Sequence, residues 1–270
     1  MSCLDDLKRV DQALERASAI FADLSGRPNR VETKASGDPV TEAERKVNAA
    51  LRAMLPRRGE GWLSEESLDD TARLAVRRIW VVDPLDGTRE FVAGLPEWSI
   101  SIALVEDGQA VVGGVRNPAT GETIIGAVGH GVTYNRRKAH PRDTSNLAGA
   151  EVLASRTEFE RGEWAPFMGE SFRIRPCGSV AYKLALVAAG RADATWTLVP
   201  KHEWDVAAGV ALVRAAKAEV WIPGGAPLAF NRMEPKFPGL AAAAPGIAHD
   251  LRDLLKHHVD MGIEPHRRSV

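Results

Sequence analysis

The stretch "WVVDPLDGTREF", residues 80–91, places two carboxylates three positions apart at the end of an apolar run. The apolar residues predict a buried strand that delivers Asp83 at its carboxyl end. Pro84 fixes the next backbone torsion, and Gly87 allows an approach that a Cβ atom would block. The side chains of Asp83 and Asp86 can therefore point in the same direction.

Two ionised carboxylates that are brought together repel each other unless a cation lies between them. An oxygen-rich site of this kind suits Mg²⁺ or Mn²⁺. The alternative is that Asp83 or Asp86 only caps the following helix. The spacing does not fit an EF-hand loop, which needs acids at every second position. Pro84 occupies the place of the nucleophile in the Asp-x-Asp-Gly-Thr pattern of the aspartyl-phosphate phosphatases, so that mechanism lacks its attacking residue.

Composition indicates an ordinary globular protein. The 270 residues include 35 Lys and Arg against 36 Asp and Glu, and 44% are hydrophobic. A net charge of -1 gives no electrostatic reason to expect a nucleic acid polymer or a membrane as partner. The two cysteines indicate a reducing compartment. The charged, helical start is not a secretory signal, and the apolar runs are too short for a bilayer. We therefore expect a soluble cytoplasmic protein.

The apolar pattern changes along the chain. Helices are expected over residues 4–20, 41–55, 179–190 and 205–218. Strands are expected over residues 79–82, 98–105, 109–116, 122–128, 151–155, 171–175, 192–198 and 219–222. The early strands form an antiparallel meander, whereas the second half alternates between strands and helices.

The remaining segments carry weaker signals. Residues 32–40 read as a loop or an edge hairpin, and residues 57–67 as a loop around a short strand. Residues 256–270 read as a frayed or docked tail. The polar segment 140–149 suggests a boundary between an N-terminal α+β domain, residues 1–145, and a C-terminal α/β domain, residues 146–270.

Two further stretches contain acids. "SEES" places Glu65 and Glu66 ahead of the strand that leads to Asp83, and "EWDVAAG" places Asp205 at the start of a helix. Each has a structural alternative: Glu65 and Glu66 could belong to a solvated acidic loop, and Asp205 could be a helix N-cap.

Together the three stretches resemble a known family. "SEES", "WVVDPLDGT" and "WDVAAG" have the order and approximate spacing of the inositol monophosphatase family. "GDPVTEAER" and "CGSVAYKLALVAAGRAD" also resemble segments of that family, so the likeness covers about residues 30–225. It implies a layered αβαβα sandwich, of the α+β or α/β class, and a metal-dependent phosphomonoesterase.

The resemblance also implies roles for individual residues. The metal ligands would be Glu65, Asp83, the carbonyl of Leu85, Asp86 and Asp205. They would hold two or three Mg²⁺ ions, with Mn²⁺ as a possible substitute. The catalytic residues would be Glu65, Asp83 and Thr88, with Thr88 orienting the attacking water. The phosphate ester would contact Gly87, Thr88, Arg89 and Asp205.

The expected activity is the hydrolysis of a small phosphorylated metabolite, similar to inositol monophosphate, by a metal-activated water. The alternative is a 3'(2'),5'-bisphosphate nucleotidase of the CysQ type. A non-catalytic relative that binds a phosphorylated ligand is a third possibility, but it would be expected to lose one of the motif residues, and none is missing. The resemblance further implies lithium sensitivity and a homodimer.

The sequence departs from the family at two positions that bear on substrate choice. Leu198 stands near the place where inositol phosphatases often carry a Glu for substrate hydroxyls. "DGTREF" has the basic-Glu-Phe form of the nucleotidases, so Arg89 either meets a second phosphate or is solvated. Lys201 and His202 either face the substrate or lie on the surface.

Three further features have structural readings. Glu44 stands where the family usually has Asp, and with Thr41 it makes a capping-box pattern. His257 and His258 are adjacent in a charged segment, which favours a solvated tail over a metal pair. Cys177 is expected to be a small buried side chain rather than a nucleophile.

Overall fold

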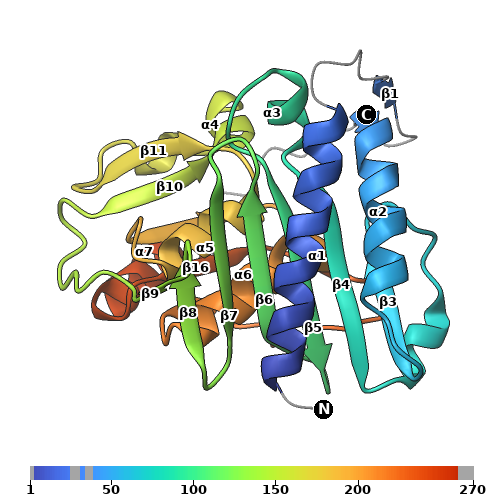
Figure 1. Cartoon of the computed structure of the whole chain (residues 1–270). Helices are drawn as coiled ribbons and strands as arrows, with labels where there is room; N and C mark the ends of the chain where they lie inside the picture. The colour runs from blue at the N-terminus through green and yellow to red at the C-terminus, as the bar shows by residue number, and fades with distance from the viewer. Residues whose placement is uncertain (1–2, 25–30, 34–38, 261–270) are drawn as a thin grey trace.

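The chain folds into five layers in the order αβαβα (Figure 1). The computed structural model describes residues 3–24, 31–33 and 39–260. Helices α1, Cys3–Leu24, and α2, Glu42–Met54, lie side by side over one face of a seven-stranded sheet. Helices α5, Val180–Ala188, and α6, Glu203–Ala215, separate that sheet from a five-stranded one. Helix α7, Ala248–Asp260, packs on the far side.

The larger sheet runs in chain order, β3-β4-β5-β6-β7-β8-β9. Only the β3–β4 pair is parallel, and the other pairs within this sheet are antiparallel. The strands are β3 (Glu60–Ser64), β4 (Arg78–Asp86), β5 (Ser99–Glu106), β6 (Gln109–Asn117), β7 (Glu122–Ala127), β8 (Gly131–Tyr134) and β9 (Arg137–Ala139).

The smaller sheet has the order β11-β10-β12-β16-β14. Strand β10 is parallel to both of its neighbours, and β16 is antiparallel to both of its own. The strands are β10 (Glu151–Ser155), β11 (Arg173–Cys177), β12 (Ala194–Thr197), β14 (Glu219–Trp221) and β16 (Leu240–Ala243). Two small two-stranded sheets complete the strands: β1 (Val31–Thr33) with β2 (Pro39–Thr41), and β13 (Lys201–His202) with β15 (Lys236–Phe237).

Strand β4 contributes side chains to two hydrophobic cores, one on each face of the sheet. Successive side chains of a strand point to opposite faces of the sheet. Ile79 and Val81 join the core shared with α5 and α6, whereas Trp80 and Val82 join the core under α1 and α2. All four are buried, which explains why this strand is continuously apolar rather than alternating.

Two glycines of β6 let helices approach both faces of the same strand. A Cβ atom at Gly113 would lie 2.4 Å from the carbonyl oxygen of Ala208 in α6. A Cβ atom at Gly114 would lie 2.3 Å from Cγ1 of Val10 in α1. The Gly-Gly pair therefore allows α6 and α1 to pack closely against the two faces of β6.

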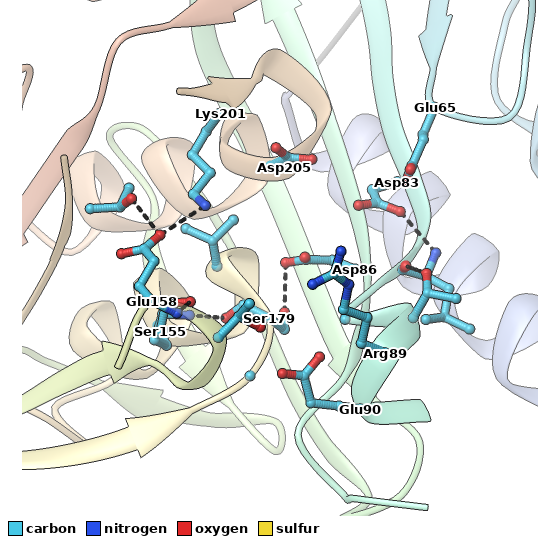
Figure 2. A pocket seen from close by; sticks show the side chains of 18 residues that line it. Glu65, Asp83, Asp86, Arg89, Glu90, Ser155, Glu158, Ser179, Lys201 and Asp205 are labelled. Carbon is cyan, nitrogen blue, oxygen red and sulfur yellow. Dashed lines mark hydrogen bonds and ion pairs between the residues drawn. The ribbon is translucent and has the colours of Figure 1, made fainter. Parts of the chain in front are cut away.

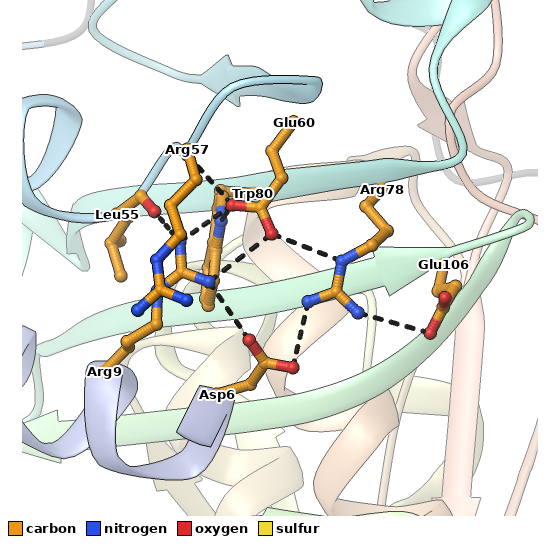
Figure 3. A network of polar contacts seen from close by, with 8 residues as sticks. All are labelled: Asp6, Arg9, Leu55, Arg57, Glu60, Arg78, Trp80 and Glu106. Carbon is orange, nitrogen blue, oxygen red and sulfur yellow. Dashed lines mark hydrogen bonds and ion pairs between the residues drawn. The ribbon is translucent and has the colours of Figure 1, made fainter. Parts of the chain in front are cut away.

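A buried ionic network fixes α1 to the sheet (Figure 3). Asp6 and Arg9 of α1 are 3.1 Å apart, and Arg9 lies 2.7 Å from Glu60 of β3. Arg78 of β4 donates to Asp6 at 2.9 Å and to Glu60 at 3.2 Å. The indole of Trp80 also donates to Glu60, at 2.9 Å. Each charge thus has several partners, as buried charges require.

The sequence-based expectations hold for most of the secondary structure. The predicted helices and strands are present with ends that differ by a few residues. The expected hairpin is seen as β1 and β2, although its residues 34–38 lie outside the described residues. Of the tail that was expected to be frayed or docked, residues 256–260 end helix α7 and are docked through the buried His258, and residues 261–270 lie outside the described part.

Helix α7 was not predicted, and neither were several short elements. They are α3 (Thr88–Val92), α4 (Arg156–Glu160), and the 3₁₀ helices at Thr71–Ala75, Ala165–Phe167 and Pro245–Ile247, as well as β8, β9, β13, β15 and β16. Within the described residues, no helix is long and apolar enough to cross a membrane. The division into domains 1–145 and 146–270 stays a prediction.

Candidate active site

One cavity of about 260 Å³ collects the predicted site residues (Figure 2). Its lining includes every residue assigned a role from the sequence: Glu65, Asp83, Leu85, Asp86, Gly87, Thr88, Arg89 and Asp205. The remaining lining residues are Glu90, Ser155, Thr157, Glu158, Gly178, Ser179, Val180, Lys183, Thr197 and Lys201. Segments separated by more than a hundred residues thus meet around one space.

The end of β4 places the first two acids. Asp83 pairs with Ser101 of β5 and Asp86 with Ser99, and the register shifts between the two pairs. A shift of this kind re-aims side chains at the end of a strand. Gly87 is the N-cap of α3 with φ 94° and ψ 41°, a left-handed conformation that suits glycine. Neither acid caps α3, so the simple capping alternative is wrong.

Each of three carboxylates is oriented by a hydrogen bond to one of its oxygens. Oδ1 of Asp83 accepts from the backbone N–H of Leu85 at 2.9 Å. Oδ2 of Asp86 accepts from the Ser179 hydroxyl and the Ala181 N–H, both at 2.7 Å. Oδ2 of Asp205 accepts from the His202 N–H at 2.8 Å. A carboxylate held through one oxygen can offer the other to a ligand.

Asp205 is not the N-cap of α6. The helix begins at Glu203 after the N-cap His202, and Asp205 is its third residue. Its bond back to the His202 N–H belongs to a capping box, so the structural and the functional readings of Asp205 are compatible.

Burial and mutual repulsion raise the pKa values of the acids. Burial raises the pKa of Asp83 well above its usual range, and the charges of Glu65, Asp86 and Asp205 raise it further. Burial raises the pKa of Asp205 to about 8, helped by Asp86 and Glu65. The pKa of Asp86 is also raised by burial, against the lowering effect of Ser179. A cation bound among these crowded acids would therefore relieve their repulsion.

The donor set fits a hard divalent cation. The candidate donors are carboxylate oxygens and one backbone carbonyl, the ligands that Mg²⁺ prefers. In the part of the chain that the structure describes, no three Asp, Glu, His or Cys side chains already converge to hold a metal ion. One oxygen of each of Asp83, Asp86 and Asp205 instead faces a hydrogen-bond donor.

Thr88 meets a second acid, Glu44. The Thr88 hydroxyl lies 2.9 Å from Oε1 of Glu44 and 3.2 Å from the carbonyl oxygen of Leu85. Glu44 also accepts from the backbone N–H of Thr41 and closes the capping box of α2. The capping reading of Glu44 is thus confirmed, and its side chain reaches the candidate site as well. Burial raises the pKa of Glu44, while hydrogen bonds from Thr41 and Thr88 lower it.

The structure bears on several open alternatives, although Arg89 lines the cavity and is also exposed, so both of its readings stay open. Arg89 and Lys201 line the cavity, whereas His202 is not part of its lining and stacks on Trp204 with ring centroids 4.4 Å apart. Burial lowers the pKa of His202 to about 4. Leu198 packs against the core between the smaller sheet and α7 rather than lining the cavity.

Two expectations outside the cavity have different outcomes. Cys177 is buried, as predicted, and burial raises its pKa to about 11, which fits an unreactive thiol. The solvated-tail reading of the histidines is wrong for His258. That residue is buried, packs against the ring of Phe167 at 4.5 Å and bonds to the Leu254 carbonyl, whereas His257 is exposed.

Sequence reasoning missed the residues that reach the cavity from α4 and α5. Ser179 adopts φ 53°, rare for a residue with a Cβ atom, and its hydroxyl holds Asp86. Lys183 is buried and donates to the carbonyls of Cys177 and Ser179 at 3.2 and 3.1 Å. Glu158 is also buried and lines the cavity. The Ser-x-x-x-Lys spacing at a helix start was visible, but its target Asp86 is not near it in sequence.

The family model and the phosphatases among the relatives place this layered fold and acidic cavity in a class of enzyme, the hydrolases of phosphate monoesters. The chain belongs to the inositol monophosphatase family, whose model matches residues 4–256.

Individual relatives carry the names of different phosphatases. The chain is 35% identical over 217 residues to an inositol-1-monophosphatase of Mesorhizobium japonicum, covering 77% of this chain and 81% of that one. It is 34% identical over 234 residues to a histidinol-phosphatase of Mycobacterium tuberculosis, covering 82% and 85%. Among solved structures, the Thermotoga maritima IMPase superposes with a TM-score of 0.78 at 28% identity, covering 94% and 97%.

Proposed function

We propose that the protein is a Mg²⁺-dependent phosphatase of a small phosphorylated metabolite similar to inositol monophosphate. The observation that carries this proposal is the meeting of Glu65, Asp83, Asp86 and Asp205 with Thr88 in one cavity. Three separate segments supply these residues, and their burial and mutual repulsion raise pKa values that a bound cation would lower again.

The four carboxylates and the Leu85 carbonyl would hold the metal ions. Bound Mg²⁺ would neutralise the phosphate and lower the pKa of the attacking water. Mn²⁺ is a possible substitute because it accepts the same oxygen donors.

The chain itself supplies orientation and proton handling. The Thr88 hydroxyl, fixed between Glu44 and the Leu85 carbonyl, is placed to align a water at the edge of the acid cluster. Glu44 can accept a proton through that hydroxyl, since its carboxylate touches it directly. Hydrogen bonds from Ser179 and Ala181 already fix the Asp86 side chain, so binding a ligand costs it little additional conformational entropy. Gly87, the N-cap of α3, and Arg89, the second residue of that helix, would contact the phosphate.

A small substrate fits the size of the cavity. About 260 Å³ accommodates a phosphate with one sugar-sized or polyol-sized group. A 3'(2'),5'-bisphosphate nucleotidase remains the alternative, resting on the basic residue Arg89 beside the phosphate loop.

The test is a panel of esters assayed with Mg²⁺: myo-inositol 1-phosphate, histidinol phosphate, fructose 1,6-bisphosphate and adenosine 3',5'-bisphosphate. We expect hydrolysis of myo-inositol 1-phosphate with a kcat/KM at least equal to that of the nucleotide. If the nucleotide is hydrolysed faster, and Arg89→Ala lowers its kcat/KM selectively, the alternative replaces the proposal. No hydrolysis of any ester with Mg²⁺ or Mn²⁺ would contradict both.

Three other features stay predictions. Lithium is expected to inhibit by competing for a weakly held Mg²⁺ site, which an activity titration at tens of millimolar Li⁺ would test. A homodimer is expected by family resemblance and can be checked by sedimentation. A cytoplasmic location is expected from the cysteine content.

A further inference from the structure

The wall of the cavity away from Glu65 and Asp83 carries an ion pair (Figure 2). The Lys201 ammonium lies 3.0 Å from Oε1 of Glu158, and their side chains are 21% and 3% exposed. The Thr197 hydroxyl donates to the same Glu158 oxygen at 2.7 Å. Glu158, Thr197 and Lys201 all line the cavity.

Three elements of the smaller-sheet half hold this pair in place. Glu158 is the third residue of α4, and its N–H donates to the N-cap hydroxyl of Ser155 at 3.4 Å. Thr197 ends β12, and Lys201 pairs in β13 with Phe237 of β15. A charged pair with so little exposure is costly to bury unless its geometry is well defined. Because the pair lies on the cavity wall, it can also contact a bound substrate.

This wall is the part of the cavity that the leaving alcohol of the substrate would contact. If the phosphate lies at the metal ligands, as the proposed function requires, the leaving alcohol must extend across the cavity. The wall away from Glu65 and Asp83 then meets the alcohol rather than the phosphate. Leu198 packs against the core beside α7 and lies outside the lining, so it does not meet the alcohol, whereas Glu158 offers a hydrogen-bond acceptor on this wall.

We propose that Glu158 and Lys201 recognise hydroxyl groups on the leaving alcohol. An ion pair has no net charge, so it gives little net attraction for a second anionic group. It does place a carboxylate acceptor next to an ammonium donor, which matches two adjacent hydroxyls, one donating and one accepting. The acceptor that Leu198 does not supply would thus come from α4. This assignment rests on the proposed function.

The test compares two esters of different leaving groups. One is myo-inositol 1-phosphate, and the other is p-nitrophenyl phosphate, whose leaving group has no neighbouring hydroxyls. The readout is the ratio of the two kcat/KM values at saturating Mg²⁺. We expect Glu158→Gln to lower this ratio about 10- to 100-fold, because a charge-assisted hydrogen bond to a substrate hydroxyl is lost. Lys201→Met should lower the ratio in the same direction.

A matched control uses an ion pair remote from the cavity. Arg252 and Glu219 are 2.9 Å apart and are 43% and 47% exposed, so Glu219→Gln makes the same change, and Arg252→Met the corresponding loss of a cation, in an ion pair at the surface. These variants should leave the ratio unchanged. Thermal unfolding of each variant separates loss of fold from loss of recognition.

The failures are distinguishable. In one outcome the wild type is active, and Glu158→Gln and Lys201→Met lower kcat/KM for both esters by the same factor. That result would limit the pair to a structural role and overturn the assignment. A selective loss of adenosine 3',5'-bisphosphate hydrolysis in Lys201→Met would overturn it in favour of anion recognition. A wild type that hydrolyses neither ester would contradict the proposed function itself.

Discussion

Glu44 connects the architecture of a helix start with the chemistry of the cavity. One oxygen of its carboxylate accepts from the Thr41 N–H and the other lies 2.9 Å from the Thr88 hydroxyl. Glu44 therefore completes the capping box that stabilises α2, and from the same helix it orients Thr88 in the cavity. The sequence displayed the capping box, but the contact with Thr88 crosses 44 positions and needed the folded chain.

This double contact predicts that activity and stability can be separated. Glu44→Gln keeps the shape but removes the charge next to Thr88, so we expect kcat to fall about 100-fold, the lower range for a lost acid–base group. Thr41→Ala removes a capping hydroxyl and should cost about 1 kcal/mol of unfolding free energy with little change in kcat. Urea unfolding and phosphate release measure both. Equal kcat in Glu44→Gln and wild type would remove Glu44 from the reaction.

The candidate site was predictable where its residues lie close together in sequence. Asp83, Asp86 and Thr88 fall within one strand end, so a motif describes them. Ser179 and Glu158 contribute through tertiary contacts from α5 and α4, and nothing local marks a serine or a glutamate as part of a distant cavity.

At the scale of elements, the spacing of apolar residues predicted helices and strands correctly where the residue types also favour the structure that forms. The amphipathic pattern predicted α1 and α2, and β-branched residues predicted β4 to β7. Strand β16, "LAAA", was missed because alanine favours helices. All four of its side chains are buried between packed helix layers, so small size rather than strand propensity decides its sequence.

The same layer packing makes Gly113 sensitive to substitution. A methyl group there would stand 2.4 Å from the Ala208 carbonyl oxygen, a backbone atom that cannot rotate away. We expect Gly113→Ala to lower the unfolding free energy by about 1–3 kcal/mol, the usual cost of overpacking. Gly169→Ala is the control, since a Cβ atom there would meet no atom within 4 Å beyond its chain neighbours. A urea midpoint for Gly113→Ala equal to that of the control would contradict this packing account.

At the scale of the whole molecule, long-range contacts hold the layers in register. The network of Asp6, Arg9, Glu60 and Arg78 joins residues from the first helix and two strands, and no local pattern predicted it (Figure 3). Burial would raise the pKa of Glu60, but hydrogen bonds from Arg9 and Trp80 outweigh it and lower the value to about 2. Folding therefore stabilises the ionised form of Glu60.

This pKa predicts a loss of stability in acid. Because the folded pKa of Glu60 lies below its unfolded value of 4.5, its contribution is present above pH 4.5 and is lost as the pH falls toward 2. The shift corresponds to at most about 3 kcal/mol at neutral pH, and solvent screening reduces it. Glu60→Gln should lose up to that much at pH 7 and show a flatter decline between pH 4.5 and 2.

Glu106→Gln provides the control for that experiment. Glu106 is 38% exposed and lies 3.5 Å from Arg78, so its removal should cost at most about 1 kcal/mol. Denaturant unfolding across the pH range measures all three proteins. Parallel curves for wild type and Glu60→Gln would show that Glu60 does not link stability to pH.

The central claim is that the acid cluster acts through bound metal, and Asp83 is its most buried member, at 1% exposure. The most direct measurement is kcat for myo-inositol 1-phosphate against free Mg²⁺, for metal-stripped wild type and Asp83→Asn. We predict no turnover without metal, saturable recovery in wild type, and a kcat at least ~100-fold lower in Asp83→Asn, since metal charge stabilisation contributes several kcal/mol. A metal-stripped wild type that turns over fully in EDTA would contradict the account.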